Sequence, residues 1–299
     1  MAIIGAPNAG KSTLVNALVG AKVTIVSHKV QTTRAPVRGI AIEGDSQLVF
    51  IDTPGIFRPK RRLDRAMVGA AWTGAGEADV IGLIVDAAKG IDDEVAAIID
   101  KLAGGHGAAR LILILNKVDR LREKSQLLTL AADLAGRLKP DRVFMISALA
   151  ASGIADLKAY LAGVVPPGPW HYPEDDISDL PMRMLAAEIT REKIYHRLHD
   201  ELPYSITVET TSYVERKAKG KTPASVRIEQ TIFVERDSQK KIVLGKGGAT
   251  IKEIASEARK ELMGILDQTV HLFVFVKVRE GWEQDPERYR EMGLEFPKE

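Results

Sequence analysis

The chain of 299 residues contains no cysteine, which excludes disulfide bonds and thiolate zinc sites. No apolar run approaches the roughly 18 to 20 residues of a membrane-spanning helix, and no signal peptide precedes the first motif. The 6 histidines show no spacing typical of metal ligands. These absences lead us to expect a cytoplasmic protein without structural metal.

The chain also lacks an overall excess of charge. It carries 42 Lys and Arg against 40 Asp and Glu, a formal net charge of +2. Residues 216–260 differ from this average, with twelve Lys and Arg against five Asp and Glu, a local charge of +7. A local basic stripe is typical of surfaces that contact a phosphate backbone, and the alternative is an ordinary solvated surface.

The length exceeds what one hydrophobic core usually organises, so we expect two domains. A boundary is visible at residues 166–173, where four prolines and a glycine break any helix, followed by three acidic residues. We predict a first domain over residues 1–165, a linker over 166–180, and a second domain with a short C-terminal tail over 181–299.

The first motif begins four residues into the chain, directly after an apolar run, and has the spacing of a phosphate-binding loop. Gly5 and Gly10 let backbone N–H groups surround a phosphate, Lys11 supplies a point charge, and Ser12 is placed to bind Mg²⁺. A helix is predicted to continue to residue 19, with its N-terminus toward the anion. The predicted nucleotide contacts here are Gly5, Ala6, Pro7, Asn8, Ala9, Gly10, Lys11, Ser12 and Thr13.

A second motif discriminates between bases. The apolar run 111–115, typical of a strand buried on both faces, ends in Asn116, Lys117, Val118 and Asp119. A carboxylate at Asp119 accepts from both N1–H and the 2-amine of guanine, whereas adenine would leave the charge unpaired. Lys117 can cover the base and Asn116 can tie this loop to the phosphate loop. A further loop similar to guanine-contacting loops contains Ser147, Ala148 and Leu149.

The metal side of the site is predicted at the end of strand 48–51. Asp52 there would hold Mg²⁺ through water, and the Gly55 amide would respond to the γ-phosphate. The residues predicted to contact nucleotide here are Asp52, Thr53, Pro54 and Gly55. A threonine of the polar loop 30–34 would complete the Mg²⁺ shell; Thr33 is preferred, with Thr32 left open.

The second half predicts a helix over 180–202, two alternating strands joined by the basic turn 217–221, a short helix, a helix over 249–266 and a strand over 270–278. A Gly-x-x-Gly turn joins the two later helices and would let a sugar-phosphate chain approach bare backbone. The alternative is a plain helix-to-helix turn. The predicted RNA contacts are Lys241, Ile242, Gly245, Lys246, Gly247, Gly248, Ala249 and Lys252.

Together these elements resemble a translation-factor-type GTPase, and Gly-x-Pro-Asn-x-Gly-Lys-Ser with Gln-Thr-Thr-Arg resembles the Era family. The second half is similar to a type II KH domain, so the resemblance covers nearly the whole chain. It implies an α/β P-loop GTPase domain with a mostly parallel sheet and helices on both faces, followed by an α+β type II KH domain. It also implies a GTP-hydrolysing factor that uses GTP/GDP and Mg²⁺ and assists maturation of the small ribosomal subunit.

The same resemblance implies partners. The KH domain would bind single-stranded RNA near the 3′ end of the small-subunit ribosomal RNA; no DNA is expected, and a monomer is expected. The alternative function is a GTPase that regulates a membrane-associated or other RNA-processing complex. In that case the basic surface would meet anionic lipid, with a peripheral fraction on the inner face of the membrane.

The candidate catalytic groups are Lys11, Thr33, Gly55 and Asn8. Ile56 follows Gly55 where small signalling GTPases have a glutamine that orients water, so slow intrinsic hydrolysis is expected. The resemblance implies that Asn8 helps hold a K⁺ ion beside the phosphates. The alternative for Asn8 is a turn residue selected for its backbone conformation.

Overall fold

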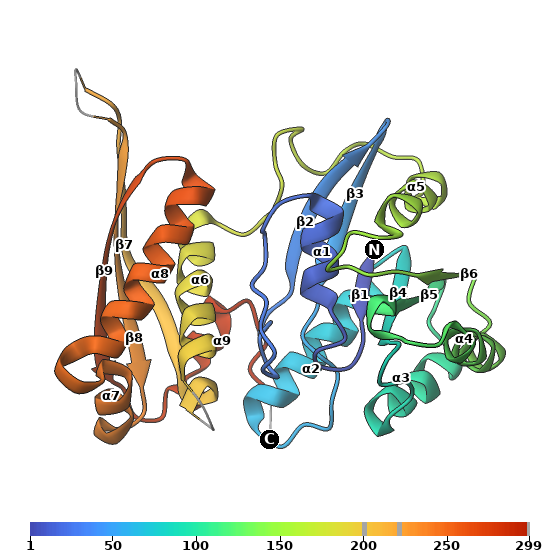
Figure 1. The fold of residues 1–299 in the computed structure, drawn as a ribbon, viewed down its shortest axis with the longest axis horizontal. Helices are drawn as coiled ribbons and strands as arrows, with labels where there is room; N and C mark the ends of the chain where they lie inside the picture. Colours follow the sequence, from blue (N-terminus) through green and yellow to red (C-terminus); the bar gives the residue numbers. More distant parts are fainter. Residues whose placement is uncertain (199–201, 220–222, 298–299) are drawn as a thin grey trace. The chain divides into compact units, whose positions relative to one another are not determined.

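The computed structural model describes residues 1–198, 202–219 and 223–297. It divides into two compact units, one formed by Met1–Asp179 with Pro286–Glu299 and the other by Leu180–Asp285 (Figure 1). The first unit alternates strands and helices, and the second combines helices with a small sheet. The predicted fold class is confirmed.

The first unit is built on a six-stranded sheet with the order β2-β3-β1-β4-β5-β6. All neighbouring pairs are parallel except β2 and β3, which pair antiparallel. The strands are β1 (Ala2–Ile4), β2 (Val37–Glu43), β3 (Ser46–Asp52), β4 (Val80–Asp86), β5 (Arg110–Asn116) and β6 (Arg142–Met145). The predicted strands at 48–51 and 111–115 therefore lie inside β3 and β5.

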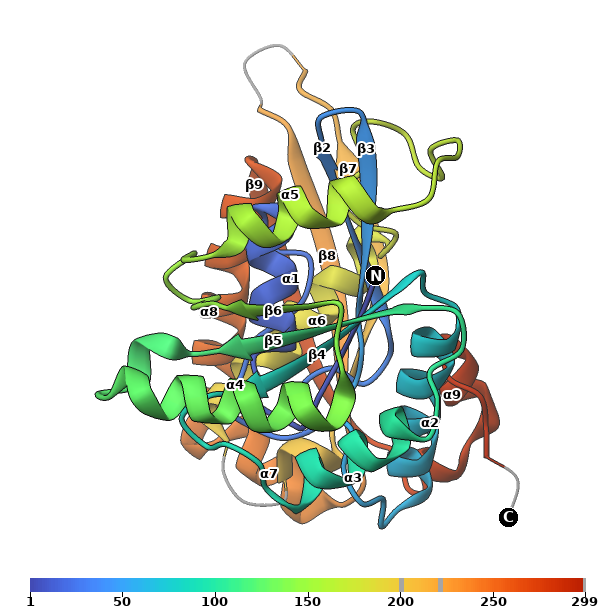
Figure 2. The same ribbon diagram turned by 90° about the vertical axis from the view of Figure 1, so that its right-hand side faces the viewer.

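Helices cover both faces of this sheet (Figure 2). One core contains side chains of α1 (Lys11–Val19) and α5 (Ile154–Val164). The other contains side chains of α2 (Arg62–Gly76), α3 (Asp93–Ala103) and α4 (Lys124–Leu138). Because both faces are buried, β4 and β5 consist almost entirely of apolar residues. The loops that follow β1, β3 and β5 meet at the carboxyl edge of the sheet, where open α/β folds bind ligands.

The predicted linker does not run free over its whole length. Near its end it pairs with β2, the outer strand of the sheet: the Ile40 N–H donates to the Ile177 carbonyl at 2.9 Å. The Arg38 guanidinium lies 3.0 Å from the Asp179 carboxylate. The linker therefore belongs structurally to the first unit as far as Asp179.

The second unit follows the predicted order of helix, strand, strand, short helix, helix and strand. Its sheet has the order β7-β8-β9, with β7 and β8 antiparallel and β8 and β9 parallel. One face packs against helices α6, α7 and α8. The elements are α6 (Met182–Arg197), β7 (Thr207–Arg216), β8 (Ser225–Val234), α7 (Asp237–Leu244), α8 (Ala249–Leu266) and β9 (Thr269–Val278), with short 3₁₀ turns at Leu202–Ser205 and Lys246–Gly248.

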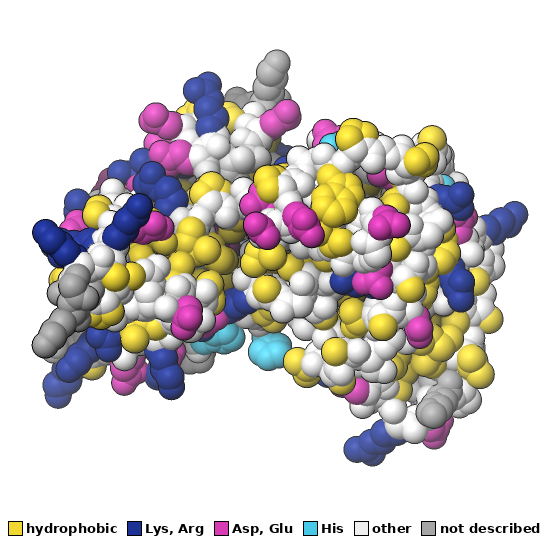
Figure 3. All heavy atoms as spheres, turned by 90° about the horizontal axis from the view of Figure 1, so that it is seen from above, with side chains coloured by type: hydrophobic (Ala, Val, Ile, Leu, Met, Phe, Trp, Pro, Cys, Tyr) yellow, Lys and Arg dark blue, Asp and Glu magenta, His cyan; other side chains and the backbone are white. Residues whose placement is uncertain are grey.

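Two predicted segments fall partly outside the described residues. The helix predicted over 180–202 ends at Arg197, and residues 199–201 are not described. Of the basic turn predicted at 217–221, residues 220–222 are likewise not described. Figure 3 shows Lys and Arg side chains, with Asp and Glu between them, over the part of this unit around the β7–β8 hairpin.

The C-terminal segment differs from the predicted boundary, which gave it to the second domain. After the turn Trp282–Gln284, α9 (Pro286–Glu291) and the residues that follow belong to the first unit. Tyr289 and Leu294 are buried, and the Arg62 guanidinium lies 4.8 Å from the centre of the Phe296 ring. Burial of these apolar side chains holds the segment there. Among the described residues, no helix is long and apolar enough to cross a bilayer.

Candidate functional site

The phosphate-loop glycines are required by close approaches of other atoms. A Cβ on Gly5 would lie 2.4 Å from the Ile84 carbonyl oxygen, and a Cβ on Gly10 would lie 2.2 Å from Asn116 Nδ2. Gly10 also has φ = 102°, a left-handed conformation that favours glycine. The loop therefore presents its backbone without side chains at the two places where it turns.

Lys11 lies inside this loop and begins α1. Its ammonium donates to the carbonyls of Gly5 at 3.1 Å and Ala6 at 2.9 Å. Burial lowers the pKa of Lys11 to about 8, and the nearby Asp52 carboxylate opposes this shift. Burial destabilises the charged form of Lys11, and the negative charge of a bound phosphate would stabilise it again. The site is therefore suited to an anionic ligand.

Three oxygen-bearing side chains converge beside Lys11. Ser12 Oγ donates to Asp52 Oδ2 at 2.8 Å, Thr33 Oγ1 donates to the same oxygen at 3.1 Å, and the two hydroxyls lie 2.9 Å apart. Burial raises the pKa of the Asp52 carboxyl, while hydrogen bonds from Ser12 and Thr24 lower it. Asp52 Oδ1 is buried and has no hydrogen-bond partner in the described part of the chain. Hydroxyl and carboxylate oxygens are the donors that Mg²⁺ prefers, so these residues fit that ion.

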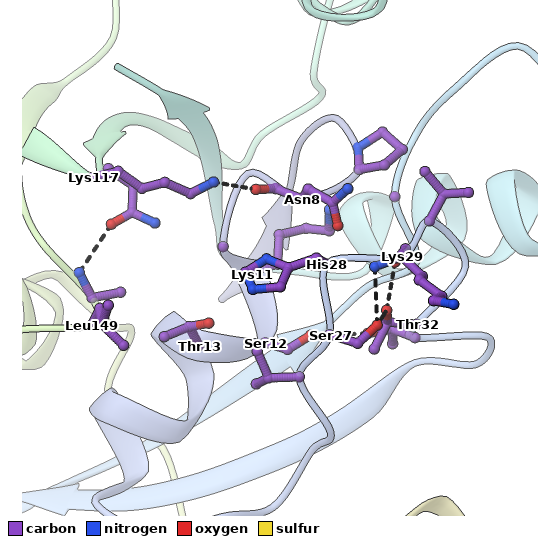
Figure 4. A pocket seen from close by; sticks show the side chains of 18 of the residues that line it. Asn8, Lys11, Ser12, Thr13, Ser27, His28, Lys29, Thr32, Lys117 and Leu149 are labelled. Carbon is purple, nitrogen blue, oxygen red and sulfur yellow. Dashed lines mark hydrogen bonds between the residues drawn. The ribbon is translucent and has the colours of Figure 1, made fainter. Parts of the chain in front are cut away.

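The two threonines of the loop before β2 are placed differently. Thr33 is buried and reaches Ser12 and Asp52. Thr32 Oγ1 instead lies 2.6 Å from Ser27 Oγ and donates to the Lys29 carbonyl at 2.6 Å (Figure 4). The geometry therefore favours Thr33 of the two alternatives.

The Asn116 side chain joins its own loop to two others. The sequence predicted the connection to the phosphate loop. Asn116 Nδ2 donates to the Ala9 carbonyl at 2.9 Å, and its Oδ1 accepts from the Ala148 N–H at 3.0 Å. The side chain is buried. Asn116 therefore fixes the predicted base-contacting loops against the phosphate loop.

Lys117 extends this network. Its ammonium donates to the Asn8 carbonyl at 2.6 Å (Figure 4). It also donates to the Asp86 carboxylate at 2.6 Å. Asp86 was missed by sequence reasoning, although the signal was present, since it ends the buried strand β4 beside Asn116. Asp119 is exposed in the short turn Val118–Arg120 and lines the pocket, so its carboxylate can receive a base.

One pocket collects most of the predicted nucleotide contacts. The predicted residues that line it are Pro7, Asn8, Gly10, Lys11, Ser12, Thr13, Thr33, Gly55, Asn116, Lys117, Asp119, Ala148 and Leu149. The predicted residues that do not line it are Gly5, Ala6, Ala9, Asp52, Thr53, Pro54 and Ser147. The pocket is also lined by residues that had not been assigned: Val26, Ser27, His28, Lys29, Val30, Gln31 and Arg120. The loop before β2 therefore contributes more to the pocket than its two threonines indicated.

The loop after β3 lies against the phosphate loop. A Cβ on Gly55 would lie 3.0 Å from Pro7, so only glycine fits without displacement. The Ile56 N–H donates to the Gly5 carbonyl at 3.0 Å, and the Ile56 side chain is buried. Ile56 therefore offers no polar group that could orient water.

The Gly-x-x-Gly turn of the second unit joins α7 to α8. Gly245 has φ = 72°, and a Cβ there would lie 2.2 Å from Thr250 Oγ1. Gly247 and Gly248 also have positive φ, with open space around each. The predicted contacts Lys241, Ile242, Lys246, Ala249 and Lys252 are exposed around the turn. The turn leads directly into the N-terminus of α8, where the helix dipole favours an anion.

Comparisons with known proteins agree with this geometry. The sequence matches the family described as 50S ribosome-binding GTPase over residues 1–117 and the family described as KH domain over residues 201–283. GTPase Era of Bradyrhizobium sp. (strain BTAi1 / ATCC BAA-1182) is 65% identical over 299 residues, covering 100% of this chain and 94% of that protein. The chain belongs to the Era family of GTPases. GTPase Era of Rhizobium meliloti (strain 1021) is 62% identical over 298 residues, 100% of this chain and 93% of that protein.

Solved structures of Era superpose over nearly the whole chain. One is Era in complex with MgGDPNP and nucleotides 1506-1542 of 16S ribosomal RNA, with 37% identity, a TM-score of 0.90, and coverage of 98% of this chain and 97% of that one. Another is a point variant of Aquifex aeolicus Era bound to GDP.AlF4⁻, with a TM-score of 0.89 at the same identity and coverage. Membership of the Era family confirms the predicted GTPase and KH architecture.

Proposed function

We propose that this Era-family protein binds and hydrolyses GTP with Mg²⁺, binds single-stranded RNA near the 3′ end of the small-subunit ribosomal RNA, and assists small-subunit maturation. The observation that carries the GTPase part is that Lys11, Ser12 and Thr33 line one pocket with Asp119, while the Ser12 and Thr33 hydroxyls both donate to the buried Asp52 carboxylate behind it. The Gly-x-x-Gly turn carries the RNA part. A related protein of known structure combines both ligands.

In this proposal the phosphate loop and Lys11 bind the phosphates, and Asp119 selects guanine. When bound, Mg²⁺ neutralises charge on the β- and γ-phosphate oxygens. Ser12 and Thr33 would hold the ion directly, and Asp52 would hold it through water. Gly55 brings a backbone N–H toward the γ-phosphate. Hydrolysis then depends on electrostatic stabilisation, because Ile56 cannot position water.

The two threonines give a matched pair of variants. Thr33→Ala should weaken Mg²⁺-dependent GTP binding about tenfold and slow hydrolysis. The substitution removes the hydroxyl proposed to bind Mg²⁺, and the loss of one contact to a charged group has about this effect. Thr32→Ala should change both less than about twofold, since its hydroxyl bonds within its own loop. Titration of GTP with and without Mg²⁺ measures this difference. Equal effects of the two substitutions would remove Thr33 from the site.

Asn8 supports a test of K⁺. Asn8 has φ = 62°, a conformation that asparagine tolerates better than most residues, which fits the turn-residue alternative. Its side chain also lines the pocket and makes no hydrogen bond within the described ranges. We expect replacement of K⁺ by Na⁺ at constant ionic strength to lower the hydrolysis rate about tenfold with little change in GTP affinity, as for a lost transition-state charge. Asn8→Ala should show the low rate in both salts. Equal wild-type rates in K⁺ and Na⁺ would leave Asn8 as a turn residue.

The RNA part of the proposal is tested by mapping crosslinks between the chain and isolated small ribosomal subunits in the presence of GTP. Crosslinks from residues around Lys246 to the 3′ end of the small-subunit RNA are expected. Crosslinks confined to ribosomal proteins, or to RNA distant from that end, would contradict it.

The cytoplasm is the proposed location, because that is where small subunits assemble. If the basic surface instead binds anionic lipid, the protein should co-float with vesicles that contain phosphatidylserine. Competition between such vesicles and the RNA segment at equal salt separates the two, because RNA should be preferred in this proposal.

A further inference from the structure

The outer face of the three-stranded sheet, the face not covered by α6, α7 and α8, carries an unusual row of side chains. Along β9 the even-numbered residues from Val270 to Val278 point to the helices, and the odd-numbered ones point outward. The outward positions are Thr269, His271, Phe273, Phe275 and Lys277, all exposed. Phe273 is 44% exposed and Phe275 is 51% exposed, so two aromatic rings meet solvent on adjacent outward positions.

The neighbouring strand supplies a cation to this row. Arg227 of β8 lies in register with His271, and its guanidinium is 4.9 Å from the centre of the Phe273 ring. Glu229 accepts from Arg227 at 2.7 Å and fixes its plane there. A guanidinium held over an aromatic ring is itself a surface on which a base can stack.

The charge of this face is positive at both ends of the aromatic pair. Arg216 of β7 points to the same face by register, beyond Arg227. Lys277 follows Phe275 on β9. Neither Arg216 nor Lys277 forms an ion pair with another described residue. An anionic strand that crosses the two rings would therefore meet a cation before and after them.

We propose that Phe273 and Phe275 form a second RNA-binding surface, on which two unpaired bases of a single-stranded RNA stack while its phosphates lie near Arg216 and Lys277. The spacing suits stacking, since alternate residues of a strand are about 7 Å apart. This leaves room for one base on Phe275 and one on the pair formed by Phe273 and Arg227. This inference rests on the proposed RNA-binding function and adds a surface distinct from the Gly-x-x-Gly turn.

The strand that carries this surface contacts the helix that precedes that turn. The helix that leads into the turn, α7, contacts β9, and β9 is the edge strand of the sheet. An RNA leaving the turn would reach the outer face around the edge at β9, the strand against which both α7 and α8 pack. Val214 of β7, which is 46% exposed, shares this face with Arg227 by register. A protein partner is less suited, because the apolar surface is limited to Val214 and the two rings and is flanked by cations.

The test uses the full chain and two RNAs from the small-subunit 3′ end, one of four nucleotides and one of twelve. Phe273→Leu/Phe275→Leu keeps apolar, strand-compatible side chains but removes the rings. We expect it to bind the twelve-nucleotide RNA about 10- to 100-fold more weakly and the four-nucleotide RNA with unchanged affinity. The control Phe273→Tyr/Phe275→Tyr keeps both rings and should bind like the wild type.

A Lys277→Gln variant tests the charge. The slope of log affinity against log salt for the twelve-nucleotide RNA should become shallower by about 0.7, the value for one phosphate contact on a single strand. Unchanged affinity of the leucine variant for the longer RNA would overturn the proposal, as would an equal loss in the tyrosine control. A change of oligomeric mass without a change in RNA affinity would assign the face to protein contact and also overturn it. Failure of the wild type to bind either RNA would instead contradict the RNA-binding function itself.

Discussion

The double substitution Lys246→Asp/Gly247→Asp should reduce RNA binding at least about 100-fold and leave GTP affinity close to that of the wild type. Two carboxylates would replace a cation and a bare backbone at the turn where a phosphate has to approach. The nucleotide pocket contains no residue of this turn, so its ligand should not be affected. Filter binding with the 3′ RNA segment, beside a GTP titration, measures both.

The structure adds a cost to this variant. Gly247 has φ = 61°, so any residue with a Cβ is strained there, by about 1 kcal/mol. No atom lies within 4 Å of the added Cβ, so the loss of folding stability comes only from the strained backbone conformation. Lys246→Asp alone avoids the strain, and Lys260→Asp makes the same charge change on the exposed surface of α8. A folded double variant with wild-type RNA affinity would exclude the turn as an RNA site.

The second large effect is expected at Asp119. Asp119→Asn should lower GTP affinity about 10³-fold, because two hydrogen bonds to a charged acceptor, roughly 1.5 to 3 kcal/mol each, are lost. Xanthosine triphosphate should then bind better than GTP, since the new amide donates to the carbonyl that replaces the 2-amine. Asp119 is exposed, so the fold should be unaffected.

Asp100→Asn is a matched control, because Asp100 is an exposed carboxylate of α3 that does not line the pocket. Nucleotide competition assays with GTP, ATP and xanthosine triphosphate measure the preference. Comparable binding of ATP and GTP by the wild type would contradict the assignment of the loop from Asn116 to Asp119.

Sequence alone predicted the parts of the site whose chemistry is local. Gly5, Gly10 and Lys11 indicate a phosphate loop because the backbone geometry and the charge are encoded within eight residues. Asn116 at the end of an apolar strand was placed for the same reason. Parts of the second unit were equally readable, because β9 alternates in burial and α7 ends at Gly245.

The remainder depends on contacts between distant segments. Asp86 marks the end of an apolar strand, but no local pattern indicates that its carboxylate pairs with Lys117. Nor does one indicate that Thr33 rather than Thr32 turns toward Asp52. The C-terminal segment has too few apolar residues to indicate which core it joins. Its position is decided by burial of Tyr289 and Leu294, which only the folded chain reveals.

The pairing of the linker with β2 has a practical consequence for anyone who divides this chain. An unpaired outer strand presents a row of free N–H and C=O groups that can recruit another chain. A fragment that stops at residue 165, where the sequence places the domain boundary, would expose β2 along the stretch from Arg38 to Ile40. A fragment that continues through Asp179 carries its own cover for that edge, and should stay in solution at concentrations where the shorter fragment aggregates.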